Sequence, residues 1–380
     1  MERSRSFAAR LCLVLLSLGA SFHHTNSFSS VPSSASSSSF NRWATNNKNN
    51  NILILDHLNI NHEKGRHDWL KTFYVDFLQC ALDPRKVQNV DKGRKTLWMN
   101  VGAQQLHLPE GKPDAQVLDG IVTLVYPDLN SLETRFKKDK SIQKSLQGSK
   151  FAMTRNQGND VSPPNLLVTD PWGSVFRLIE GRDPDDRDTR GSQAGDKSEG
   201  LAMSDLTIFT PPNCNLHGVG RFYEQVLGSV VLDLEPENSC TIAVGPKQTL
   251  TFQTNPTSTA ESHVDLRDDN VQPPAGAPIF RSNYGPHVSM YVADLSSTYK
   301  RTDALGLVYV NPRFQRRAYT LEEAIDDCMF RCLDIVDPEN VDDGPILQLE
   351  HEVRSVIQRD GSMYKSCPFH EIPEGCVSPS

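Results

Sequence analysis

The sequence predicts an α+β fold in which a unit of one strand, one helix and further strands occurs four times. The main observation is an internal repeat: an apolar strand, a polar turn and a helix at residues 52–77 return about 150 residues later, at residues 203–235. Each helix carries an aromatic pair, Phe73-Tyr74 and Phe222-Tyr223, with a leucine four positions after the tyrosine. A repeat of this length indicates two related halves.

The first half contains two such units. Residues 52–61 alternate as a strand, and the following helix, with aromatic residues four apart, must end by Asp83 because Pro84 follows. Strands are expected at 96–102 and 104–111. The second unit has a strand at 119–129, an amphipathic helix at 129–146, and strands at 151–157, 165–170 and 174–181, with a hairpin turn at 170–173.

The second half repeats this order after a charged stretch without periodicity, residues 181–200, which is typical of a linker. Its first unit has strands at 206–212, 240–245 and 249–255, and a polar insertion follows at 257–278. Its second unit opens with a strand at 287–295 and a helix at 296–306. A later helix has a Thr320–Glu323 capping box and precedes two closing strands that end near residue 352.

The amino terminus is typical of targeting sequence. Arg3, Arg5 and Arg10 precede a ten-residue apolar run at 11–20, which fits a signal peptide over residues 1–21 and is too short to span a bilayer. Residues 22–51 are rich in serine and contain no acidic residue. The two segments together resemble the bipartite presequence of algae with secondary plastids, which implies a plastid location. Secretion with a disordered Ser/Asn linker is the alternative.

Charge and cysteine content exclude several classes. The full chain has a net charge of −8, and without residues 1–55 the charge is near −12, which does not fit a nucleic-acid-binding protein. No later apolar run reaches membrane length. Eight cysteines include Cys12 in the signal, so a disulfide framework is not expected. Cys367, His370 and Cys376 are a candidate redox pair or metal clip, although a structural zinc site needs four ligands.

The four modules and the FYxxxL helices resemble the vicinal oxygen chelate superfamily, which includes glyoxalase I, extradiol dioxygenases and antibiotic resistance proteins. The resemblance covers residues 52–352. It implies two tandem domains with cup-shaped mixed sheets, 52–180 and 201–352, followed by a tail at 353–380. It also implies divalent metal ligands on the first and last strands of each module, with Fe, Mn, Zn, Ni or Co as the ion.

Matched to this sequence, the resemblance implies ligand positions in all four modules: His57 and His107, Gly120 and Glu180, Asp205 and Thr251, and His287 and Glu350. Pairing within halves would give one cup with His57, His107 and Glu180, and a second with Asp205, His287 and Glu350. Pairing the first module with the fourth would gather His57, His107, His287 and Glu350 in one cup. We expect the second arrangement, because Gly120 and Thr251, which cannot supply the family's ligands, then fall together in the other cup.

Three functions remain open for a small-molecule substrate. The first is a glyoxalase-like lyase or isomerase in which Glu350 or Glu180 moves a proton. Residues for glutathione binding are not identifiable. The second is an extradiol-type dioxygenase, and the third is non-catalytic binding of a small ligand. Arg313, Arg316 and Arg317 could clamp a substrate anion, or could form a solvated basic turn.

Overall fold

The computed structural model describes residues 50–88, 96–111, 114–158, 163–181, 197–267 and 279–380. The predicted signal peptide, nearly all of the Ser-rich segment and residues 182–196 of the predicted linker lie outside these ranges. In the part that is described, no helix combines the length and the apolar character needed to cross a bilayer.

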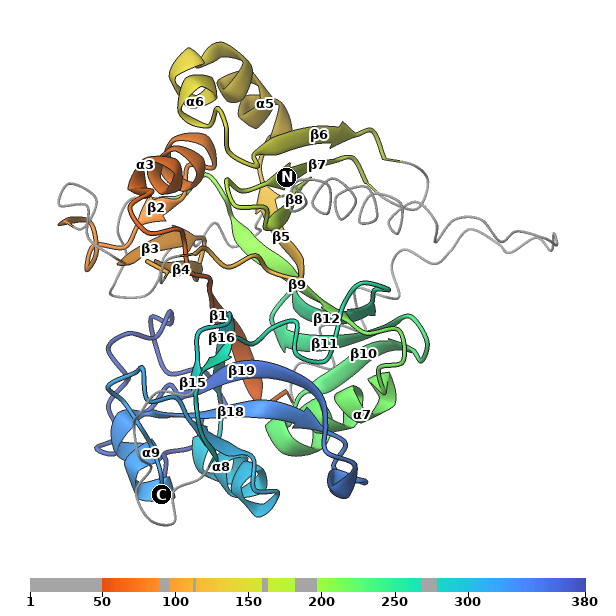
Figure 1. Ribbon diagram of the computed structural model, residues 1–380. Helices are drawn as coiled ribbons and strands as arrows, with labels where there is room; N and C mark the ends of the chain where they lie inside the picture. Colours follow the sequence, from red (N-terminus) through yellow and green to blue (C-terminus); the bar gives the residue numbers. More distant parts are fainter. Residues whose placement is uncertain (1–49, 89–95, 112–113, 159–162, 182–196, 268–278) are drawn as a thin grey trace, which may run out of the picture. The chain divides into compact units, whose positions relative to one another are not determined.

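Most strands belong to two large mixed sheets (Figure 1). The first sheet has the order β14-β17-β18-β19-β16-β1-β4-β3-β2. Its strands are β1 (Ile52–Asn59), β2 (Ala81–Leu82), β3 (Thr96–Val101), β4 (Gln104–Pro109), β14 (Ile279–Phe280), β16 (His287–Val292), β17 (Val308–Val310), β18 (Met329–Val336) and β19 (Pro345–Ser355).

The second sheet has the order β10-β11-β12-β9-β5-β8-β7-β6. Its strands are β5 (Gly120–Tyr126), β6 (Ala152–Asn156), β7 (Asn165–Thr169), β8 (Val175–Glu180), β9 (Ala202–Thr210), β10 (Val230–Glu235), β11 (Ser239–Gly245) and β12 (Gln248–Thr254). A small sheet pairs β13 (Leu266–Arg267), in the insertion, with β15 (Ser282–Asn283), which follows it.

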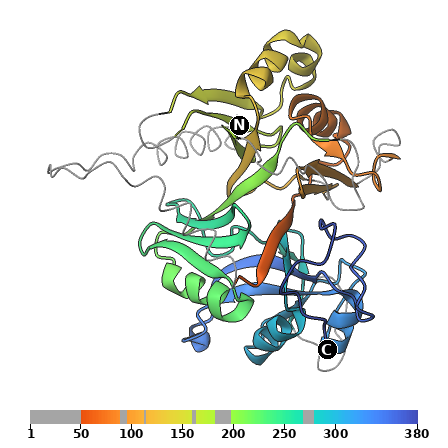
Figure 2. The ribbon, with the colours of Figure 1, turned by 180° about the vertical axis from the view of Figure 1, so that it is seen from behind.

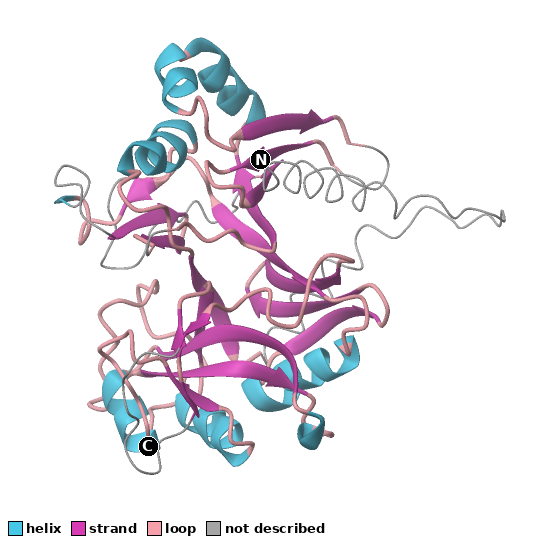
Figure 3. Cartoon of the chain, in the orientation of Figure 1, coloured by secondary structure: helices cyan, strands magenta, loops and turns pink. Residues whose placement is uncertain are grey.

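Each module also contributes helices, which lie at the periphery of the molecule around the strands (Figure 3). They are α3 (His67–Leu70), η2 (Lys71–Phe77), α5 (Leu129–Lys138), α6 (Lys140–Ser145), α7 (Leu216–Arg221), η4 (Phe222–Leu227), α8 (Leu295–Ala304) and α9 (Leu321–Asp327), with a 3₁₀ turn, η5 (Val341–Asp343), before β19.

All four modules have the same internal strand order. In each, the first strand pairs in parallel with the last, and the last pairs antiparallel with the strand before it, as in β1-β4-β3 and β16-β19-β18. The two first strands meet at the centre of each sheet, β1 with β16 and β5 with β9, both antiparallel. The first module therefore shares a sheet with the fourth, and the second module with the third.

The helices that carry the aromatic pairs, η2 and η4, pack their aromatic side chains into the core. Phe73, Tyr74, Phe222 and Tyr223 are buried, as the repeat predicts. Both helices begin as α-helices and continue as π-helices over the aromatic pair, with Leu78 N–H donating to Phe73 O across five residues. One continuous apolar core contains residues of all four modules.

Several local predictions hold, and one helix differs. The capping box of Thr320 and Glu323 begins α9 as expected. The helix predicted over 129–146 is divided, because Asp139 adopts an extended conformation and caps α6 by accepting from Ser141 N–H and Ile142 N–H. After β19 the tail returns to the connection between β16 and α8, where Val377 N–H donates to Ala293 O (Figure 2).

Candidate metal centre

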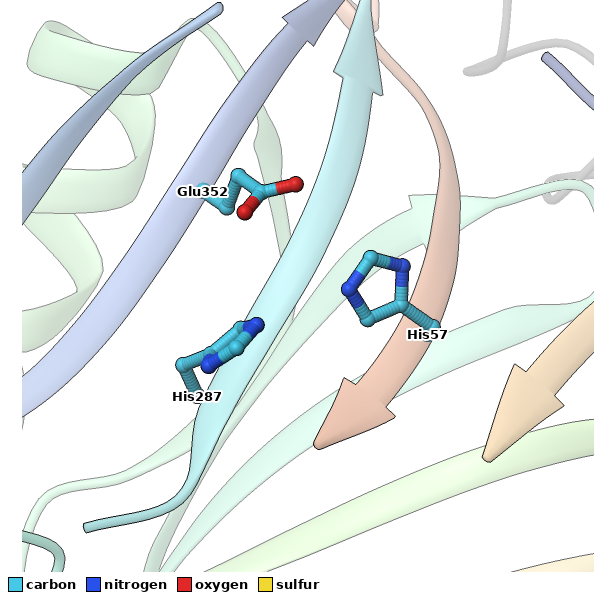
Figure 4. A group of neighbouring side chains, drawn as sticks. All are labelled: His57, His287 and Glu352. Carbon is cyan, nitrogen blue, oxygen red and sulfur yellow. The ribbon is translucent and has the colours of Figure 1, made fainter. Parts of the chain in front are cut away.

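Three side chains from neighbouring strands of the first sheet point toward one another (Figure 4). They are His57 on β1, His287 on β16 and Glu352 on β19, and one nitrogen or oxygen of each lies within 4.8 Å of the others. All three are buried. The strand register causes this meeting: His57 lies opposite Ser289, and Ser289 lies opposite Glu352, so one row crosses three strands.

The hydrogen bonds and burial keep the two imidazoles suited to bind a cation. Asp56 Oδ2 lies 2.8 Å from His57 Nδ1, which fixes the proton on Nδ1 and leaves Nε2 as the free lone pair. Burial lowers the pKa of His57 against the pull of Asp56. Burial and Arg331 hold the pKa of His287 well below its usual value. Neutral imidazole is the form that ligates metals.

Glu352 is ionised despite its burial. Burial raises the pKa of its carboxyl, but Arg331 and Arg354 outweigh this effect and hold the pKa well below the ordinary range. Both arginines form ion pairs with Glu352. The donor set is thus two neutral imidazoles and one carboxylate, which fits a divalent first-row metal that the carboxylate shares with its arginine partners.

Glu350, the predicted carboxylate ligand, lies two residues before Glu352 on β19, and its oxygens accept hydrogen bonds from other side chains. Its oxygens accept from Arg331 Nη1 at 2.6 Å, Asn283 Nδ2 at 2.8 Å and Asn311 Nδ2 at 2.9 Å. Glu350 and Glu352 share one face of β19 because side chains alternate. The register, not the face, selects Glu352: Glu350 lies opposite His287, and Glu352 lies in the row of His57.

His107 lies beside the group and is related to Glu352 by module symmetry. His107 on β4 pairs with Asn59 on β1, just as Glu352 on β19 pairs with Ser289 on β16. The His107 ring stacks between His57, at a centroid distance of 3.7 Å, and Trp98, at 4.4 Å. The structure therefore gathers His57, His107 and His287, although His107 is not among the three groups whose ligand atoms are closest.

The side chains open into a cavity of about 660 Å³. Its lining is rich in cations and aromatic rings, and includes Trp98, His107, Phe314 and Tyr364. Arg313 and Arg316 are part of this lining, while Arg317 is not: its guanidinium donates to Phe314 O at 2.8 Å and to Pro312 O. The predicted anion clamp thus has two of its three residues at the cavity.

The remaining predicted residues lie elsewhere. Glu180 ends β8 in the second sheet, is exposed, and accepts from Leu129 N–H at the start of α5, so it does not join His57. Asp205 accepts from the hydroxyls of Thr207, Thr249 and Thr251. A Cβ at Gly120 would lie 2.1 Å from Thr207 O, so the β5–β9 crossing requires glycine there.

The carboxyl-terminal cysteines lie close to each other in the tail. Burial and the neighbouring Cys367 raise the pKa of Cys376 to about 11. Among the residues that the structure describes, the groups of ligand atoms close enough to share an ion do not include Cys367, His370 or Cys376.

Four repeated modules, paired into two large mixed sheets, confirm the predicted α+β fold and agree with what the resemblance to the vicinal oxygen chelate superfamily implies. No protein-family model matches the sequence, and no curated protein matches it. Solved structures do align. The structure named "putative dioxygenase from Bacillus subtilis" is 12% identical, covers 80% of this chain and 86% of its own, and has a TM-score of 0.47.

Two other alignments fall on dioxygenase and lyase structures. The 2,3-dioxygenase LapB from Pseudomonas sp. KL28 is 11% identical over 83% of this chain and 94% of its own, with a TM-score of 0.26. Lactoylglutathione lyase from Agrobacterium tumefaciens is 14% identical over 33% and 92%, with a TM-score of 0.23. The identities are low and every TM-score is below 0.5, so the assignment of the fold rests on the strand order and the fourfold module.

Proposed function

We propose that this chain is a divalent-metal enzyme of the extradiol dioxygenase type, which opens an aromatic ring that carries two adjacent oxygens and an anionic substituent. The observation that carries the proposal is the group of His57, His287 and Glu352, whose ligand atoms lie within 4.8 Å of one another. Two imidazoles and one carboxylate on one face are the donor set of non-haem Fe(II) oxygenases, and they leave positions open for substrate.

The state of the carboxylates favours this reaction over a lyase or isomerase. A glyoxalase-type reaction needs a carboxylate that takes up and returns a proton, with a pKa near the working pH. Arg331 and Arg354 hold the pKa of Glu352 well below its ordinary range, after allowing for the opposite effect of burial. Glu350 accepts three hydrogen bonds from Arg331, Asn283 and Asn311. Glu352 is thus a poor proton carrier and a good fixed charge, while the side chain of Glu350 is held by its three hydrogen-bond donors.

The cavity favours a planar anion. Its lining includes six cationic side chains against two acidic ones, Asp56 and Glu352: the cations are Arg85, Lys86, Arg313, Arg316, Arg331 and Arg354. Arg313 is held in place, because its guanidinium stacks on Tyr284 at 3.8 Å and donates to Asn283 O at 2.7 Å. The rings of Trp98 and Phe314 also line the cavity and give its wall aromatic surface. A carboxylate on the substrate would be steered toward the arginines.

His107 lies at the cavity wall and is held in a fixed orientation by neighbouring side chains. Gln105 donates its amide hydrogens to Asp83 Oδ2 at 2.7 Å and Asn100 Oδ1 at 2.6 Å, so its Oε1 accepts from His107 Nε2 at 2.9 Å. This network assigns the imidazole proton to Nε2. His57, His287 and Glu352 would hold a divalent metal, which would supply Lewis-acid chemistry that lowers the pKa of two adjacent substrate oxygens.

In the overall reaction a ring carbon–carbon bond breaks and both atoms of O₂ enter the product. The electrons come from the substrate, so no further reductant is needed. The test is anaerobic reconstitution of the purified protein with Fe²⁺, followed by O₂ uptake and absorbance measurements on a series of catechols with and without a carboxylate. We expect uptake with the carboxylated catechols, and loss of uptake in Glu352→Gln and His57→Asn.

The matched control is His217→Gln, which removes an exposed imidazole on α7 and should leave the activity unchanged. Circular dichroism of each variant checks that the fold is retained. Two results would overturn the proposal. Isomerisation of a hemithioacetal by the Ni²⁺, Co²⁺ or Zn²⁺ form without O₂ uptake would assign a glyoxalase-like reaction. Tight binding of aromatic anions by the metal-free protein, with no metal taken up, would assign a binding protein.

A further inference from the structure

A second group of ligand atoms lies where the chain leaves β1 for α3. His62, in the loop after β1, His67, the first residue of α3, and Glu110, just after β4, each offer one atom, and these atoms lie within 4.8 Å of one another. None of the three residues lines the cavity of the candidate metal centre. The group is therefore separate from His57, His287 and Glu352.

The backbone holds His62 and Glu110 side by side. They form a parallel bridge, in which His62 N–H donates to Pro109 O at 2.9 Å and Gly111 N–H donates to His62 O at 2.7 Å. Glu110 Oε1 accepts from Gly65 N–H at 3.0 Å, which ties the carboxylate to the same loop. Both residues are thus positioned by hydrogen bonds that do not involve the imidazoles.

Two imidazole nitrogens in this group are buried without a hydrogen-bond partner. His62 is 1% exposed, and its Nδ1 donates to Leu108 O at 3.1 Å, so its Nε2 carries the lone pair. Both His62 Nε2 and His67 Nε2 are buried and lack a partner in the described part of the chain. The two rings meet edge to face, with centroids 4.9 Å apart. Buried polar atoms are rarely left unsatisfied, and each such atom requires an explanation.

A cation between the nitrogens explains both atoms at once. We propose that His62, His67 and Glu110 bind a zinc-class divalent cation that fastens the start of α3 to the end of β4. Two imidazole nitrogens and one carboxylate oxygen are ligands that Zn²⁺ prefers, with water or a further group in the fourth tetrahedral position. The hydrogen bond from His62 Nδ1 to a carbonyl is the supporting contact typical of metal-bound histidine.

The site has a structural role. α3 leads directly into η2, whose Phe73, Tyr74 and Phe77 are buried in the core. Trp172, from the hairpin turn of the second module, covers the group: its ring lies 5.9 Å from that of His62, and its Nε1–H donates to Glu63 Oε2 at 3.2 Å. An ion here would therefore fix the β1–α3 loop where the first and second modules meet.

The experiment uses the purified protein with His57→Gln, which removes a ligand of the candidate metal centre. After removal of metal with a chelator, equilibrium dialysis against Zn²⁺ should show one zinc ion per chain. Adding His67→Gln or Glu110→Gln should abolish this binding. The loss in affinity should exceed the roughly 10- to 100-fold that follows loss of a merely supporting contact. Glu110→Gln retains an acceptor for Gly65 N–H, so the backbone contact survives. His217→Gln on the same background is the control and should bind zinc normally.

A second measurement separates binding from misfolding. Zn²⁺ should raise the midpoint of thermal unfolding of His57→Gln and leave that of His57→Gln/Glu110→Gln unchanged, while both proteins have the same circular dichroism without metal. The proposal is overturned if His57→Gln retains no zinc. It is also overturned if the bound zinc persists in both double variants, since the ion would then lie elsewhere.

Discussion

Replacing Arg331 with methionine removes the cation that two buried carboxylates share. The side chain of Arg331 is 5% exposed, and those of Glu350 and Glu352 are 1% and 4% exposed. Removing one partner of a buried ion pair costs about 3–5 kcal/mol of unfolding free energy, because the other charge remains buried. Arg354 still contacts Glu352, and two amides still donate to Glu350. We therefore expect a loss near the lower end, about 3 kcal/mol.

Such a loss corresponds to a decrease of roughly 6–12 °C in the thermal midpoint of a chain of about 150–250 residues, and to a smaller decrease in this chain of 380 residues. The measurement is urea unfolding of the metal-free protein, followed by circular dichroism. Arg267→Met is the matched control, because Arg267 also pairs with an acid, Asp265, but the two side chains are 46% and 43% exposed. An exposed pair contributes at most about 1 kcal/mol.

The pH dependence gives a second check on the same variant. Burial raises the pKa of Glu352, but the two arginines hold it well below its ordinary range. A carboxyl with a depressed pKa stabilises the fold at neutral pH, and this contribution is lost as the pH falls through that low value. Without Arg331 the pKa is higher, so protonation relieves the uncompensated charge sooner. The stability difference between wild type and variant should therefore narrow as the pH is lowered from neutral.

Equal losses in Arg331→Met and Arg267→Met would refute this reasoning. A difference between wild type and Arg331→Met that widens on acidification would refute the assignment of Glu352 as a charge left uncompensated.

Three further predictions concern the fold and its targeting. Burial lowers the pKa of His351 from 6.5 to about 4, so the free energy of unfolding should decrease as the pH is lowered from 6.5 to 4. His351→Gln should remove about 3 kcal/mol of that decrease in urea titrations. The same pH dependence in wild type and variant would contradict this prediction. Limited proteolysis should cut first within 181–200, and the two fragments should elute together in size-exclusion chromatography, because β1 and β16 belong to different fragments and one sheet; separation of the fragments would contradict the shared sheet. Residues 1–55 fused to a fluorescent reporter should direct it to a plastid, and fluorescence retained in the secretory pathway would reject that targeting.

The repeat and the alternation of apolar residues were sufficient to predict the modules. A strand of period two and an aromatic-pair helix are local features, so β1, β9 and the helices after them could be located without contacts. The same pattern placed His57 and His287 on first strands. The linker boundaries and the amino-terminal segments remain predictions, because most of their residues lie outside the described ranges.

The choice of ligand within β19 depended on the tertiary structure. Alternation puts Glu350 and Glu352 on one face, and only the pairing of Ser289 with both His57 and Glu352 brings the second of them to the imidazoles. Likewise, Glu180 could have joined His57 only if the modules paired within halves, and the antiparallel contact of β1 with β16 excludes this. Strand register between segments more than 200 residues apart is set by packing, which local sequence does not encode.

The His62, His67 and Glu110 group had no recognisable spacing in the sequence. The two histidines are separated by a loop, not by one turn of a helix, and Glu110 is brought beside His62 by an isolated bridge outside the named strands, although 48 positions separate the two residues in the sequence. The sequence by itself determined the modules, their order and the residue types available for chemistry. The folded structure decided which of those residues meet, because the meeting points lie between modules whose relative placement depends on the burial of a common core.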